Sequence, residues 1–217
     1  MKMDVERIRI LFDRFASEYE KHMRETNHVA VQHRLIDTFL QFLSGSVLDI
    51  ATGTGTVARY IREKSQCKIY AIDSSSEMIR KASENLKGIE YRLADAQQLP
   101  YNREQFDAVL CSYGFYWFED PEKVIREVKR VLKPNGIFIV MEEEFKQGES
   151  SKPIFSKMQG YLEELANLEN YIGIADIKRK MERNGLSLIK EERLPVDEIH
   201  DTIGMVYQKK ATPYKSS

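Results

Sequence analysis

The chain of 217 residues is 42% hydrophobic and 31% charged, a composition typical of a soluble globular protein with one well-buried core. With 33 basic and 34 acidic residues, its net charge of −1 provides no global field for nucleic acid, and no apolar run approaches the ~18 residues of a membrane span. The charged N-terminus lacks a signal-peptide core, and Cys67 and Cys111 are isolated, so we expect a cytoplasmic protein with reduced thiols.

The first part of the chain predicts two amphipathic helices, over residues 4–24 and 28–43. In the second helix, apolar residues recur at helical spacing from Val31 to Leu43, and Ser44-Gly45-Ser46 ends the pattern. Strands and helices then alternate, as is typical of a parallel sheet covered by helices. The predicted strands span 47–50, 68–73, 89–93, 106–111 and 137–141, and the predicted helices include 56–64 and 78–86.

Capping signals mark where two of these helices begin. Ser74 and Glu77 form an S-x-x-E capping box, and Asp120 caps a helix that has Pro121 at its first position. The later run Glu142-Glu143-Glu144 is interpreted as a solvated strand exit. Beyond it the pattern predicts helices near 153–169 and 173–183, followed by strands near 186–194 and 203–210 that form an antiparallel hairpin.

The most informative stretch is the turn between the strand 47–50 and the helix 56–64. Gly53 and Gly55 allow a tight turn and let a ligand approach the backbone without interference from a Cβ atom. The free N–H groups that begin the helix face the crevice at the carboxyl end of the strand, where open α/β sheets bind ligands. Asp49 adds a carboxylate there, so the sequence predicts a nucleotide-type cofactor site.

Two cofactors compete for this site. Residues 53–58 fit the G-x-G-x-x-G/A dinucleotide fingerprint, and Asp73 follows at the interval expected for a carboxylate that accepts both ribose hydroxyls. A pyrophosphate near Asp49 would be repelled, at a cost of roughly 4 kcal/mol for ~4 Å and an effective dielectric constant of ~20. S-adenosylmethionine (SAM) carries an ammonium and a sulfonium instead of phosphate, so the charge pattern favours SAM.

At these residues the chain resembles the class I SAM-dependent methyltransferases, whose first motif is an acidic residue followed by G-x-G-x-G. Ala51 stands where that motif has its first glycine. The segments Phe12–Tyr19 and Trp117–Pro121 resemble the small-molecule branch that includes the ubiquinone and menaquinone C-methyltransferases. The resemblance implies an α/β, Rossmann-like three-layer sandwich with a seven-stranded, mostly parallel sheet whose last strand is antiparallel.

We expect one methyltransferase domain over 1–217, with lid helices at 1–43, a cofactor-binding core at 44–142, and substrate-side helices and final strands at 143–210. By resemblance, Asp95 accepts a hydrogen bond from the adenine amino group, and the aromatic loop 112–118 begins the pocket of a small-molecule methyl acceptor. The expected cofactor contacts are Tyr19, Asp49, Ala51, Thr52, Gly53, Gly55, Asp73, Ser74, Met78, Asp95, Ala96, Gln97, Ser112 and Tyr113, and the expected acceptor contacts are Tyr116 and Trp117.

No metal site is expected, because His22, His28 and His33 lack the spacing that aligns ligands on one helix face. No nucleic-acid partner is expected, because the net charge of −1 provides no attraction for a polyanion. Asp107 begins a strand, at the end away from the site, and is expected to be structural. No general base and no oligomeric state can be named from the sequence. Two alternatives remain open at this point: a non-catalytic SAM-binding relative and an NAD(P)-dependent oxidoreductase.

Overall fold

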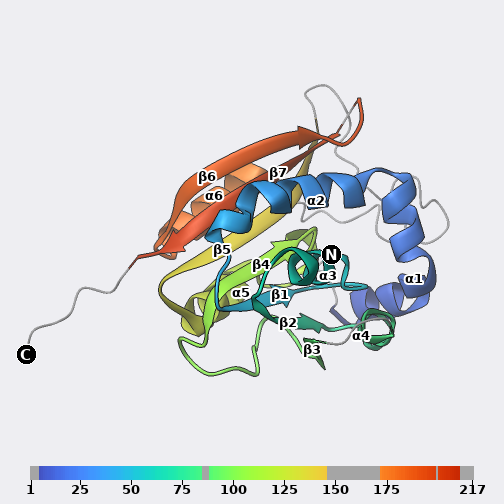
Figure 1. Cartoon of the computed structure of the whole chain (residues 1–217), viewed down its shortest axis with the longest axis horizontal. Coiled ribbons are helices and arrows are strands. Elements are labelled where there is room, and N and C mark those ends of the chain that lie inside the picture. Colours follow the sequence, from blue (N-terminus) through green and yellow to red (C-terminus); the bar gives the residue numbers. More distant parts are fainter. Residues whose placement is uncertain (1–4, 85–87, 146–171, 199, 211–217) are drawn as a thin grey trace, which may run out of the picture.

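The computed structural model describes residues 5–84, 88–145, 172–198 and 200–210 (Figure 1). Their centre is a seven-stranded sheet in the order β3-β2-β1-β4-β5-β7-β6. Strands β1 to β5 are parallel, while β7 runs antiparallel to both β5 and β6, which confirms the predicted sheet. The strands are β1 (Ser46–Ile50), β2 (Lys68–Asp73), β3 (Ile89–Leu93), β4 (Phe106–Ser112), β5 (Leu132–Phe145), β6 (Leu186–Pro195) and β7 (His200–Lys209).

Helices cover both faces of the sheet and give three layers, as predicted. Alternate residues of each strand point to opposite faces, so Val47 packs with α2 and α3 while its neighbour Leu48 packs with α5 and α6. The helices are α1 (Val5–Glu25), α2 (His28–Phe39), α3 (Thr56–Lys64), α4 (Ser76–Ser83), α5 (Pro121–Val131) and α6 (Ile174–Arg183), with single 3-10 turns η1 (Leu40–Phe42) and η2 (Phe115–Trp117).

Helix boundaries agree with the sequence except at two places. The predicted helix 28–43 ends at Phe39 and continues as η1. Helix α4 begins two residues before the predicted Met78, and its N-cap is Ser75, whose hydroxyl accepts the Met78 N–H at 3.1 Å. The predicted capping box on Ser74 is therefore wrong; the Ser75 N–H is held by Asp73, which leaves the Ser75 side chain in the capping position. The caps by Asp120 and Pro121 are confirmed.

The C-terminal half differs most from the prediction at the end of β5. This strand continues to Phe145 because β7 pairs with it along its whole second half, from Ile137 to Phe145. Glu142 and Glu143 therefore lie inside the sheet, with 0% and 2% of their surface exposed, and their interpretation as a solvated exit was wrong. Helix α6 and the antiparallel pair β6–β7 are confirmed, whereas the predicted helix 153–169 lies outside the described residues.

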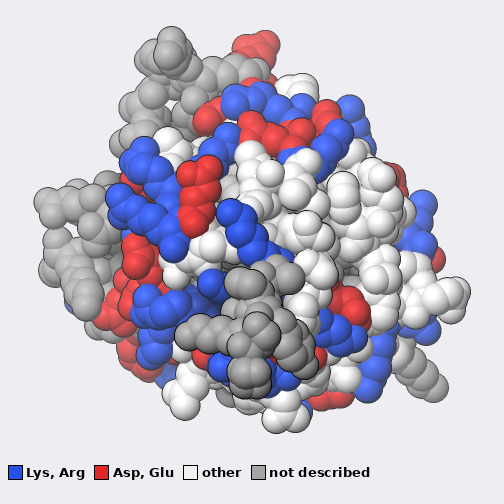
Figure 2. Space-filling view, turned by 90° about the vertical axis from the view of Figure 1, so that its left-hand side faces the viewer, with Lys and Arg blue, Asp and Glu red and all other residues white. Residues whose placement is uncertain are grey.

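Other global features agree with the composition. Both cysteines are buried and free, as expected. Lysine and arginine side chains are interspersed with aspartate and glutamate over the face that Figure 2 shows. In the part of the chain that the structure describes, no helix combines the length and apolarity that crossing a bilayer requires.

Candidate cofactor site

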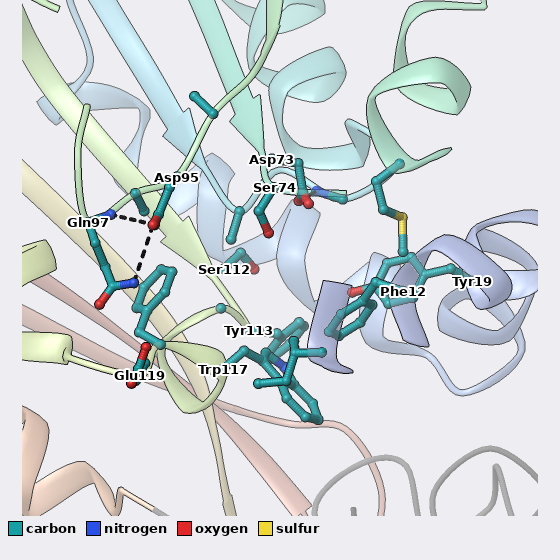
Figure 3. Close-up of a pocket in the computed structure, with 18 residues that line it drawn as sticks. Phe12, Tyr19, Asp73, Ser74, Asp95, Gln97, Ser112, Tyr113, Trp117 and Glu119 are labelled. Atoms are coloured by element: carbon teal, nitrogen blue, oxygen red, sulfur yellow. Dashed lines mark hydrogen bonds between the residues drawn. The ribbon is translucent and has the colours of Figure 1, made fainter. Parts of the chain in front are cut away.

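A cavity lies between the carboxyl ends of β1 to β4 and the N-terminal helix α1 (Figure 3). It encloses about 740 Å³ of space when its open mouth is included. A smaller cavity adjoins it and shares the lining residues Tyr19, Ala51 and Ser112. The main cavity brings together twelve of the residues singled out from the sequence: Tyr19, Ala51, Gly53, Asp73, Ser74, Met78, Asp95, Ala96, Gln97, Ser112, Tyr113 and Trp117.

Four other predicted site residues lie elsewhere. Asp49 and Thr52 line the smaller cavity only. Gly55 lines neither cavity; its φ of +79° begins α3, and a Cβ atom there would lie 2.9 Å from the Tyr91 hydroxyl. Tyr116 lines neither cavity because its hydroxyl donates to the Glu143 carbonyl. Gly55 therefore serves to let the backbone turn into α3, and Tyr116 holds the loop after β4 against β5.

The glycine loop adopts a left-handed backbone at three positions. Gly53 has φ +56° and passes close to Tyr19, because a Cβ atom on it would lie 3.4 Å from the Tyr19 ring. Ala51 has φ +52°, a conformation that favours glycine. This explains physically why a glycine at this position is usual in the motif that the chain resembles, and it identifies Ala51 as a strained residue in contact with both cavities.

Asp73 ends β2 with its carboxylate at the cavity wall. Its Oδ2 accepts the Gly53 N–H at 2.8 Å and its Oδ1 accepts the Ser75 N–H at 2.9 Å. A carboxylate offers about four acceptor positions. One position per oxygen therefore remains for a ligand, which is the arrangement that two vicinal hydroxyl groups require. Burial raises the pKa of the Asp73 carboxyl, although these backbone donors oppose the shift.

Asp95 follows β3 at the far end of the cavity and is exposed. It accepts two hydrogen bonds from Gln97, from the backbone N–H to Oδ1 at 2.8 Å and from the side-chain amide to Oδ2 at 3.3 Å (Figure 3). The side-chain oxygen Oε1 of Gln97 in turn accepts the backbone N–H of Asp120 at 3.1 Å. These contacts fix the Asp95 carboxylate against the cavity while leaving it accessible to a donor such as an amino group.

Asp49 lies deeper, with 1% of its surface exposed, beneath the loop rather than on the wall of the main cavity. Its carboxylate accepts the Thr52 hydroxyl at 2.5 Å. Burial raises the pKa of Asp49 to about 7, against the opposing effect of this hydrogen bond. Tyr19 lines both cavities, and burial together with the charges of Asp73 and Glu142 raises the pKa of its hydroxyl.

The charge of the two cavities has one sign. Their lining includes Asp49, Asp73, Asp95 and Glu119, and among the described residues that line either cavity there is no lysine, arginine or histidine. Such a site favours a cation and disfavours pyrophosphate, which normally needs basic side chains or a neutral surrounding. An uncharged adenosine moiety joined to a cationic amino-acid chain therefore fits these residues better than a dinucleotide does.

An aromatic wall closes the side of the cavity opposite Asp95 (Figure 3). Phe12 of α1 meets Trp117 edge-on, with ring centroids 5.2 Å apart, and also meets Tyr19. Tyr113 has φ +53° and its hydroxyl shares a 2.6 Å hydrogen bond with Thr202 of β7. These rings give the cavity a flat, largely apolar surface next to its acidic groups.

Sequence reasoning missed the buried polar groups behind this wall. Glu142 accepts the Phe115 N–H at 2.7 Å, and burial raises its pKa well above the ordinary value. Glu143 pairs with His28 of α2 at 2.7 Å, and Gln32 of α2 donates to Ser112 at 2.8 Å. Only a recognition that the glutamate run continues a central strand would have indicated these contacts.

The remaining sequence expectations concern residues outside the cavities. Asp107 accepts the Ser46 N–H at 2.8 Å and pairs with Lys133, at the opposite end of the sheet, as expected for a structural residue. His33 stacks on Tyr60, with ring centroids 3.8 Å apart. Across the described ranges, no cluster of three or more histidine, cysteine or acidic side chains is arranged to hold a metal ion.

Comparison with known proteins identifies the core of the chain. Residues 48–140 match the family described as a methyltransferase domain. The chain is 38% identical over 136 residues to a demethylmenaquinone methyltransferase from Thermotoga maritima, covering 61% of this chain and 59% of that protein. It is 33% identical over 130 residues to a malonyl-[acyl-carrier protein] O-methyltransferase from Salmonella typhimurium, covering 58% and 49%. The matches therefore span less than two thirds of these relatives.

A solved structure extends the similarity to the whole fold. A SAM-dependent methyltransferase from Thermotoga maritima, described as a possible histamine N-methyltransferase, superposes with a TM-score of 0.71. The match covers 92% of this chain and 99% of that one, at 20% sequence identity. This likeness shows that the two chains share the fold, a Rossmann-like sheet covered by helices on both faces.

Proposed function

Because residues 48–140 match the family described as a methyltransferase domain, we propose that the protein transfers a methyl group from SAM to a small-molecule acceptor. The observation that carries the proposal is the acidic cavity at the glycine loop, whose lining, as far as the structure describes it, includes carboxylates and no basic side chain. The sulfonium supplies an activated methyl group, and the surrounding carboxylates favour that positive charge. The named methyltransferase relatives support the same reaction.

The residues of the cavity suggest how the cofactor would lie. We propose that Asp73 accepts the ribose hydroxyls, that Asp95 accepts from the adenine amino group, and that Met78 packs against the adenine ring. The amino-acid end would extend toward the smaller cavity, where Asp49 and Gln32 lie. In this pose the methyl group would face the aromatic wall.

Catalysis is proposed to rest on alignment rather than on a dedicated base. Holding two reactants in line can supply ~7–11 kcal/mol of the barrier, which makes a positioned general base optional. Tyr113 is fixed by its bond to Thr202 and by its backbone, and Trp117 by the Phe12 ring. These rigid rings would orient a flat acceptor opposite the methyl group.

The class of acceptor is proposed from the wall and not from any one relative. The relatives' names give a demethylmenaquinone and a malonyl-[acyl-carrier protein] as their acceptors, so the family tolerates different acceptors. The wall of Phe12, Tyr113 and Trp117 favours a planar or lipophilic small molecule.

We also propose a cytoplasmic location, because the two cysteines are buried and free, as is typical of a reducing compartment.

Calorimetry tests the cofactor assignment first. Purified protein should release heat with SAM and with S-adenosylhomocysteine but not with NAD(H) or NADP(H); the reverse pattern would overturn the proposal in favour of an oxidoreductase. Cell extract incubated with the protein and methyl-labelled SAM should then yield a labelled small molecule by mass spectrometry. Cofactor binding without any labelled product, across extracts from several growth conditions, would instead indicate a non-catalytic SAM-binding protein.

A further inference from the structure

Helix α1 is fastened to the cofactor loops by a side chain that the proposed chemistry does not use. Asp13 points from α1 to the start of α4, where its Oδ1 accepts the Ser75 hydroxyl at 2.6 Å and the Glu77 N–H at 3.1 Å. The same Ser75 donates its N–H to Asp73. Asp13 thus shares the capping of α4 with Ser75 and connects α1 to the carboxylate assigned to the ribose.

A second acidic side chain fastens the other end of the same helix segment. Glu20 pairs with Arg59 of α3 at 2.8 Å. The other nitrogen of that guanidinium donates to the Thr54 carbonyl in the glycine loop at 2.6 Å. Arg59 is only 15% exposed, so this contact is screened less than a surface ion pair. Glu20 therefore reaches the glycine loop through a single side chain.

The spacing of these residues gives α1 a defined geometry over the cavity. Asp13 and Glu20 are seven residues apart, which is two helical turns and about 10 Å along the axis. Phe12 and Tyr19 have the same spacing on the neighbouring stripe, and both line the cavity. One stripe therefore faces the ligand space while the adjacent stripe holds the two loops on either side of it.

We propose that Asp13 and Glu20 are positioning residues that fasten α1 across the cofactor cavity and set the rates at which cofactor enters and leaves. The proposal rests on the cofactor assignment above. With both contacts formed, Phe12 and Tyr19 form part of the cavity wall and narrow its mouth, so movement of α1 away from the cavity widens the path for exchange. Weakening either contact raises the population of the open helix and accelerates passage in both directions.

Stopped-flow fluorescence tests this directly, because Trp117 is the single tryptophan of the chain and lines the cavity. With S-adenosylhomocysteine as the probe, Asp13→Ala and Glu20→Ala should each raise both the association and the dissociation rate constants by about tenfold, the lower end of what the loss of one hydrogen bond to a charged group predicts. Asp13→Asn keeps an acceptor oxygen and should stay near the wild-type rates. Glu18→Ala, exposed on the same helix, serves as the matched control.

Melting temperatures separate positioning from simple stability. A lower melting temperature with unchanged rate constants would overturn the proposal, as would faster dissociation accompanied by slower association, because that pattern describes a lost ligand contact. If the wild type does not bind S-adenosylhomocysteine, the proposed function fails, and hydrogen exchange without ligand tests the fastening alone. Amides of residues 8–20 should then exchange faster in Asp13→Ala and Glu20→Ala than in Glu18→Ala. Equal exchange in all three variants would contradict the proposed fastening of α1.

Discussion

Asp73→Ala is the most informative substitution at the proposed cofactor site. Each oxygen of Asp73 uses one acceptor position on a backbone N–H, from Gly53 or Ser75, which leaves one position per oxygen for a ribose hydroxyl. Hydrogen bonds to a charged group contribute about 1.5–3 kcal/mol each. Two of them, at the lower end because the half-buried carboxylate is also accessible to water, give about 3 kcal/mol, or roughly a hundredfold weaker binding.

Isothermal calorimetry with S-adenosylhomocysteine measures this loss. Because Asp73→Ala also frees two backbone donors in the loop, a second ligand is needed to isolate the ribose contact. The wild type should bind the 2′-deoxy analogue about tenfold more weakly than S-adenosylhomocysteine itself. Asp73→Ala should bind the two compounds with equal affinity. Asp107→Asn removes a carboxylate at the far end of the sheet and should leave affinity unchanged. The ribose assignment would be refuted if Asp73→Ala lost less than tenfold in affinity for S-adenosylhomocysteine. It would also be refuted if the wild type and Asp73→Ala showed the same affinity ratio between S-adenosylhomocysteine and its 2′-deoxy analogue.

Three further substitutions test the interior around the cavity. Burial raises the pKa of Asp49 from 3.8 to about 7, so between about pH 4 and 7 the folded state holds a proton that the unfolded state releases, and stability falls as pH rises. In urea unfolding, the stability of Asp49→Asn should therefore depend less on pH than that of the wild type, and identical pH profiles would contradict the shift. Ala51→Gly relieves the strain of an alanine in the left-handed conformation and should raise stability by up to ~1 kcal/mol, measured as a higher melting temperature. An alanine-to-glycine substitution at an unstrained residue would instead lower the melting temperature. Glu143→Ala leaves the buried His28 ring nitrogen without its hydrogen-bond partner and should cost about 1–3 kcal/mol in the free energy of unfolding, measured by denaturant titration. The double variant with His28→Ala should lose less stability than the sum of the two single variants, and a fully additive double variant would argue against a coupled pair.

Much of the fold could be predicted because local signals agree with the global arrangement. Helix α3 and strand β2 begin and end at the predicted residues, since Gly55 permits the turn into the helix and Asp73 ends a short apolar strand. The predicted helix 28–43 extends beyond the observed end at Phe39, because Leu40 and Leu43 continue its apolar stripe. Those side chains remain at least partly buried as the backbone tightens into η1, so hydrophobic periodicity does not reveal the change in winding.

Burial was hardest to predict where sequence chemistry argued against it. Three consecutive glutamates after the apolar run 137–141 suggest a solvated segment, because charged residues are rarely buried unless they are paired. Their partners come from distant parts of the chain: the Phe115 N–H lies on the loop after β4, and His28 on α2. No local pattern connects such positions, so the acidic interior behind the aromatic wall became visible only with the sheet assembled.

The segment Phe12–Tyr19 illustrates the difference between recognising a motif and explaining it. Resemblance alone indicated that Tyr19 reaches the cofactor, and nothing in the helical pattern gave Asp13 a role. In the folded chain, Phe12 and Tyr19 line the cavity while Asp13, 62 positions before Ser75, completes the cap of α4. A single substitution at Asp13 therefore acts on both α1 and the loop that carries Asp73. If Asp13→Ala changes cofactor exchange while Glu18→Ala does not, this coupling, and not the helical propensity of α1, is the reason for the residue.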